Sequence, residues 1–81
     1  MARTSPRKDA ELHELLEELV ADLISPDQLH GQARHVAAQL LRDGRFARFF
    51  NRLDIYNTNT RLQMLRCAVS TVQSQRVLAT V

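Results

Sequence analysis

Leucine and valine recur at spacings of three and four residues from Leu12 to Leu23, and this periodicity constrains the fold more than any other feature of the sequence. Such spacing places apolar side chains on one face of an α-helix. The face consists of Leu12, Leu15, Leu16, Leu19, Val20 and Leu23, and the opposite stripe of Glu11, Glu14, Glu18 and Asp22. Alternation of the kind that marks a half-buried strand is almost absent. The sequence therefore predicts an all-α fold.

A second helix is predicted from Ser25 to Leu41. Ser25 is a favourable N-cap, Pro26 suits the first helical position, and Gln28 completes the spacing of a capping box. The apolar face consists of Leu29, Ala33, Val36, Ala37, Leu40 and Leu41. Asp43 and Gly44 end the helix, with Gly44 in the left-handed conformation. Because only a short turn around Ser25 separates the first two helices, we expect them to form an antiparallel hairpin.

Two further helices complete the predicted bundle of three long helices and one short one. The short helix runs from Arg45 to about Asp54, and Thr60 with Gln63 repeats the capping-box spacing at the start of the last helix. The apolar face of the last helix consists of Leu62, Leu65, Ala68, Val69 and Val72. Val77, Leu78 and Val81 fall out of this phase. The end of the chain can therefore fray, dock on the body or pair with another element.

A chain of 81 residues has room for one domain, and its 44% apolar content and few Gly and Pro residues exclude a disordered or collagen-like chain. We expect a flexible basic N-terminal arm over residues 1–8 and a single helical domain over residues 9–81. No apolar run reaches the roughly 18 residues of a membrane span, and the first residues lack the apolar stretch of a signal peptide. A single cysteine suits a cytoplasmic protein.

Charge is unevenly distributed along the chain. Residues 1–8 carry a net charge of +3, residues 9–27 carry −7 without any Lys or Arg, and residues 28–81 carry +6. The acidic and basic segments can neutralise one another within the protein, or one of them can serve as a partner surface. The sequence leaves both alternatives open.

No pattern of catalytic or metal-binding residues stands out. His13 begins a His-Glu-x-x sequence, but Glu17 stands where the zinc-binding motif needs its second histidine. His30 and His35 are five residues apart and lie on different sides of a helix. Cys67 has no general base beside it and is expected to be a semi-buried apolar residue. We therefore expect no enzyme activity, no cofactor and no metal site.

The short helix holds the candidate partner-binding residues. Arg45, Arg48 and Arg52, the Arg stripe, lie on one side of it, and all three phenylalanines of the chain, Phe46, Phe49 and Phe50, lie on the other. The phenylalanines are expected mainly in the core, although one of them can anchor an interface, where aromatic and Arg residues are enriched. The Arg stripe is expected at the surface.

These features favour a small, non-enzymatic protein–protein interaction module that acts as an adaptor, regulator or chaperone-like protein. The first helix is apolar around much of its circumference, so either the last two helices wrap it or a second copy covers it. We expect a homodimer. The alternative is a nucleic-acid-binding regulator that uses the basic arm, with Arg3, Arg7 and Lys8, and the arginines from Arg42 to Arg52.

Overall fold

The computed structural model describes residues 6–52 and 57–79, which form four α-helices and one short 3-10 helix and contain no strand. The elements are α1 (Pro6–Leu23), η1 (Pro26–His30), α2 (Ala33–Leu40), α3 (Gly44–Arg52) and α4 (Thr58–Ala79). The all-α prediction is confirmed. Only α1 and α4 are long, with 18 and 22 residues, whereas α2 has 8 and α3 has 9.

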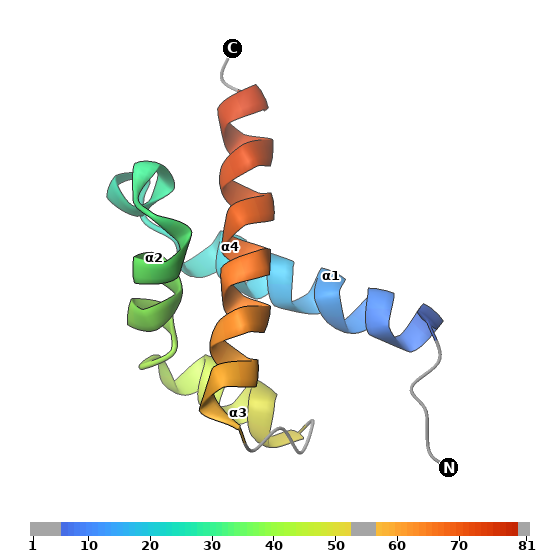
Figure 1. The fold of residues 1–81 in the computed structure, drawn as a ribbon. Coiled ribbons are helices and arrows are strands. Elements are labelled where there is room, and N and C mark those ends of the chain that lie inside the picture. The colour runs from blue at the N-terminus through green and yellow to red at the C-terminus, as the bar shows by residue number, and fades with distance from the viewer. Residues whose placement is uncertain (1–5, 53–56, 80–81) are drawn as a thin grey trace.

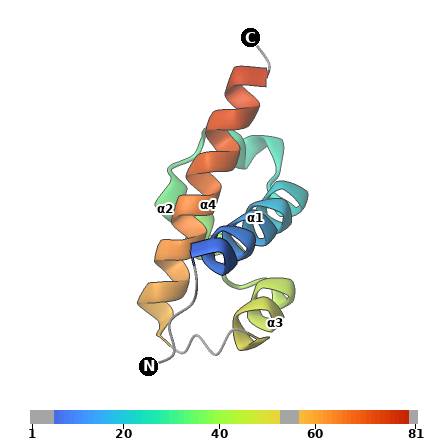
Figure 2. The same ribbon diagram turned by 90° about the vertical axis from the view of Figure 1, so that its right-hand side faces the viewer.

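Helix α4 is the central element of the fold. Both α1 and α2 make their extensive contacts with α4, and α1 crosses it while α2 lies alongside it (Figure 1). α3 lies below α1, near the first turns of α4 (Figure 2). The structure does not confirm the predicted antiparallel hairpin, because η1 lies between α1 and α2 and each of the two packs on α4 instead. None of the described helices is long and apolar enough to cross a membrane.

The core forms where α1, α2 and α3 meet α4. Its buried members are Leu16, Val20, Ile24, Val36, Ala37, Leu40, Phe46, Phe50, Leu65, Ala68, Val69 and Val72. Apart from Ile24, Phe46 and Phe50, they belong to the apolar faces predicted for the first, second and last helices, since one periodic face of each helix turns toward its neighbour. Phe46 and Phe50 are the largest fully buried side chains. Phe49 packs edge-on against Phe50, with ring centroids 5.4 Å apart.

The predicted helix over residues 25–41 is interrupted at Gly31. η1 ends at His30, Gly31 is extended with φ −78° and ψ 165°, and α2 begins at Ala33. The capping box at Ser25 is present, and the Ser25 N–H donates to Gln28 Oε1 at 2.9 Å. It caps a single 3-10 segment rather than a long helix.

Two predicted helix boundaries are wrong. Gly44 does not terminate the second helix in a left-handed conformation. It is the first residue of α3, and Asp43 Oδ1 accepts the N–H of Arg45 at 2.8 Å. Thr60 does not cap the last helix, because α4 already begins at Thr58 and Asn57 Oδ1 accepts the N–H of Asn59 at 2.8 Å. In both cases an Asx side chain just before the helix satisfies a free backbone donor.

Both ends of the chain show more helix than expected. α1 begins at Pro6, and proline is favoured at the first helical position, so residues 6–8 of the predicted arm belong to α1. Residues 1–5, including Arg3, lie outside the described residues. α4 continues to Ala79 and projects beyond α1 (Figure 1), leaving Val77 and Leu78 exposed. Val81 is outside the described part of the chain.

Candidate functional site

An open groove of about 330 Å³ runs between α1 and α3. It is lined by Leu12, Leu15, Leu19, Phe49 and Arg52, and is called the α1/α3 groove below. Leu15 exposes 53% of its surface, while the other three apolar side chains are half-buried. Three leucines and one phenylalanine therefore present a continuous apolar lining to solvent.

The groove exists because α1 carries more apolar residues than α4 can cover. Leu16 and Val20 are completely buried in the core, whereas Leu15 and Leu19 lie on the adjoining side of the helix, which faces α3. α3 is attached to the core through its buried side chains Phe46 and Phe50. Because α3 is only 9 residues long, it covers this side of α1 incompletely.

α3 also contacts the first turns of α4 through Phe50 and Arg61. The guanidinium carbon of Arg61 lies 5.8 Å from the ring centroid of Phe50, within the range of a cation–π contact. The same ring is the one against which Phe49 packs edge-on. Phe49 thus lines the groove while its ring contacts Phe50, which in turn contacts Arg61.

Exposed charges flank the apolar lining on both helices. Glu11 and Glu18 lie four residues before and three residues after Leu15, so both are its neighbours on the surface of α1. Arg45 and Arg52 occupy the same relative positions around Phe49 on α3. By this helical spacing the groove has an acidic rim on α1 and a basic rim on α3, and of these four residues Arg52 also contributes to the groove lining.

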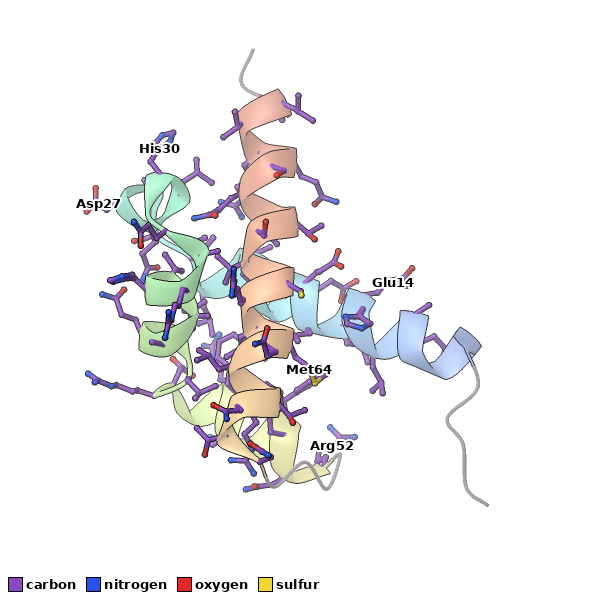
Figure 3. The ribbon with its side chains drawn as sticks, in the orientation of Figure 1. Glu14, Asp27, His30, Arg52 and Met64 are labelled. Atoms are coloured by element: carbon purple, nitrogen blue, oxygen red, sulfur yellow. The ribbon has the colours of Figure 1, made fainter. Side chains whose placement is uncertain are left out.

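The Arg stripe is exposed, as the sequence predicts. Among residues 6–52 and 57–79, none accepts a hydrogen bond from the guanidinium groups of Arg45, Arg48 and Arg52 or pairs with them as an ion. Figure 3 shows Glu14 on α1 pointing away from α3, which carries Arg52. Neutralisation of the acidic stripe by the Arg stripe within one chain is thus not observed, and the guanidinium groups are free to meet a partner.

The three phenylalanines do not share one role. Phe46 and Phe50 are 0% and 1% exposed and belong to the core, so neither can act as the interface anchor considered from the sequence. Phe49 is half-buried and lines the groove. Of the six candidate residues, the structure brings Phe49 and Arg52 together in the lining of the groove, and it leaves Arg45, beside Phe49, and Arg48 exposed on α3 outside that lining.

Other residues singled out in the sequence lie outside the groove. His13, His30 and His35 are all exposed, and in the described ranges no three His, Cys, Asp or Glu side chains are close enough to share a metal ion. The prediction that Cys67 is semi-buried is wrong. Cys67 is exposed because α1 and α2 cover only the side of α4 that carries Leu65 and Val69.

The leucines of the groove are the candidate site residues that sequence reasoning missed. Leu12, Leu15 and Leu19 share the periodicity of the buried face of α1, so the pattern alone assigns them to the core. The sequence does set Leu15 apart from the other leucines, because Glu11 and Glu18 flank it at neighbouring helical positions. A leucine bordered by carboxylates marks the edge of an apolar face, where burial by the same chain is incomplete.

No protein-family model matches the chain, and neither a curated protein nor a solved structure matches it. The role of the α1/α3 groove is therefore inferred from its own geometry and chemistry.

Proposed function

We propose that the protein is a non-enzymatic interaction module that binds an amphipathic helix in the α1/α3 groove and thereby acts as an adaptor, a regulator or a chaperone-like protein. The observation that carries the proposal is the exposed apolar lining of the groove beside unpaired arginines. Leu15 is 53% exposed at the centre of this lining. Exposed apolar surface with a polar rim is typical of protein interaction sites.

The chemistry of the groove specifies what the bound helix must look like. Its apolar side chains must recur at helical spacing to fill a groove lined by leucines and Phe49. Carboxylates beside that apolar face would pair with Arg45 and Arg52, whose planar guanidinium groups suit bidentate contacts. Leu, Phe and Arg provide no nucleophile or general base, which supports binding rather than catalysis. We place this activity in the cytoplasm, since a single cysteine forms no internal disulfide.

Nucleic acid is the competing ligand for the same region of the surface. Arg42 is exposed together with the Arg stripe, so four arginines of one short segment face solvent. Phosphate binding would use these arginines and leave the apolar groove without a role. The amphipathic helix accounts for both the arginines and the leucines, and we therefore favour it.

Fluorescence anisotropy with synthetic probes tests the proposal. The first probe is a labelled four-turn helical peptide with leucines at helical spacing and glutamates beside them. The second has lysines in place of the glutamates, and the third is a duplex DNA of arbitrary sequence. We expect the acidic peptide to bind dilute protein at least about tenfold more tightly than the lysine peptide, because the lining of the groove includes the charged side chain of Arg52 and no carboxylate.

Matched leucine variants show whether the groove is the binding site. Leu15→Asp is expected to abolish peptide binding, whereas Leu78→Asp, at an exposed leucine on α4, is expected to leave it unchanged. Equal effects of the two substitutions would refute the groove as the site. Binding of DNA alone, with a steep dependence on salt, would replace the proposal with the nucleic-acid alternative.

A further inference from the structure

The two rims of the α1/α3 groove carry the same residue pattern with opposite charge. On α1, Leu15 has a glutamate four residues before it and another three residues after it. On α3, Phe49 has an arginine four residues before it and another three residues after it. Glu11, Glu18, Arg45 and Arg52 are all exposed, and no ion pair joins the arginines to another described residue.

We infer that the helix bound in the groove is α1 of a second copy of the chain, so that two copies form a two-fold dimer with each α1 on the partner's α3. This inference rests on the proposed function and names its partner. α1 has the features that the basic side of the groove requires, because it presents exposed apolar surface at Leu15 with carboxylates on both sides.

A two-fold axis through the middle of the groove produces this pairing for both copies at once. Rotation by 180° about such an axis exchanges the α1 side with the α3 side, since residues of both helices line the groove and α1 lies above α3 (Figure 2). Each acidic rim then faces a basic rim, and each Leu15 approaches a Phe49. An interface of this kind is self-complementary, as closed dimers require.

The available surface is large enough for such a dimer. A standard interface takes about 800 Å² from each partner, roughly an eighth of the 6104 Å² that one copy exposes. α1 and α3 hold 18 and 9 residues, and α1 alone is about 27 Å long. An interface of this size would therefore take only a small part of the surface that each copy exposes.

Charge reversal on one helix at a time provides the test. The first variant is Glu11→Arg with Glu18→Arg, which makes both rims basic. The second is Arg45→Glu with Arg52→Glu, which makes both rims acidic. Sedimentation velocity measures the dimer dissociation constant of the wild type, of each variant, and of the two variants mixed, with circular dichroism as the check on folding.

We expect a dimeric wild type and, for each variant alone, a dissociation constant at least about tenfold higher, because like charges then face each other. An equimolar mixture of the two variants should form a heterodimer of wild-type affinity. Asp27→Arg is the control and should leave the dimer intact, since Asp27 is exposed on η1, outside both α1 and α3 (Figure 3). If a reversed variant fails to fold, glutamine at the same positions should weaken the dimer by a smaller factor without restoring affinity in a mixture.

Three results would overturn the inference. They are a monomeric wild type at high micromolar concentration, variants that dimerise as the wild type does, and a mixture that recovers no affinity. Each can be separated from failure of the proposed function. A monomer whose groove still binds the acidic peptide refutes the second copy as the partner and keeps the groove as a helix-binding site.

Discussion

The side-chain amide of Gln73 on α4 donates a hydrogen bond to the backbone carbonyl of Gly31, 42 positions earlier in the chain, at 2.8 Å. The same Nε2 atom also donates to the carbonyl of Gln28 at 2.8 Å. These carbonyls lie where the predicted second helix breaks, and the Gln28 carbonyl also accepts the N–H of Gly31 at 3.1 Å. One side chain from the central helix therefore stabilises the junction between η1 and α2.

Replacement of this side chain should destabilise the protein measurably. Gln73→Ala removes both hydrogen bonds and is expected to lower the free energy of unfolding by about 1–2 kcal/mol. Gln75→Ala is the matched control, because Gln75 is exposed on the same helix and should change stability by less than about 0.5 kcal/mol. Urea titration followed by circular dichroism compares the two, and equal losses would show that the junction does not depend on Gln73.

Substitution by alanine should lower the stability of the protein at one of its two glycines and raise it at the other. A Cβ on Gly31 would lie 3.2 Å from Cγ2 of Val36, which is 3% exposed and has little room to move. Gly31→Ala should therefore cost about 1 kcal/mol through overpacking. A Cβ on Gly44 meets no atom within 4 Å, so Gly44→Ala should stabilise the fold by about 0.4–1 kcal/mol. Thermal unfolding of both variants checks the signs, and a shift in the same direction would contradict this account.

The start of α4 offers a direct comparison of two capping candidates. Asn57→Ala removes the oxygen that accepts the Asn59 N–H and should cost about 1 kcal/mol. Thr60→Ala should change stability by less than about 0.5 kcal/mol, since Thr60 is an exposed residue inside the helix. Chemical denaturation of both variants measures the difference. A larger loss at Thr60 than at Asn57 would restore the capping box predicted from the sequence.

The exposure of Cys67 predicts its reactivity. Because its side chain is at the surface of α4, a thiol reagent should modify the folded protein completely, at a rate within about tenfold of that in denaturant. Cys67→Ser should change the free energy of unfolding by less than about 0.5 kcal/mol. Protection of the thiol in the native state would indicate that the outer face of α4 is covered in solution.

The identity of the helical segments and of most core residues follows from the sequence alone. Leu16 and Val20, and likewise Leu65 and Val69, are buried where the apolar period predicts. The exposure of the Arg stripe is predicted for the same reason, because a helix that buries Phe46 and Phe50 turns its other side outward. These properties depend on the order of residues within single helices, which the sequence displays directly.

Tertiary structure decided the choices between local signals of similar strength. Asn57 and Thr60 are both acceptable caps, and the helix began at the earlier one. The segment from Ser25 to Leu41 is periodic throughout, yet it breaks at Gly31, where Gln73 binds the carbonyls that the break exposes. Leu15 and Leu16 are equally apolar neighbours, but α4 covers one of them and the short helix α3 leaves the other at the surface. Burial depends on which elements meet in space, and periodicity within one helix does not contain that information.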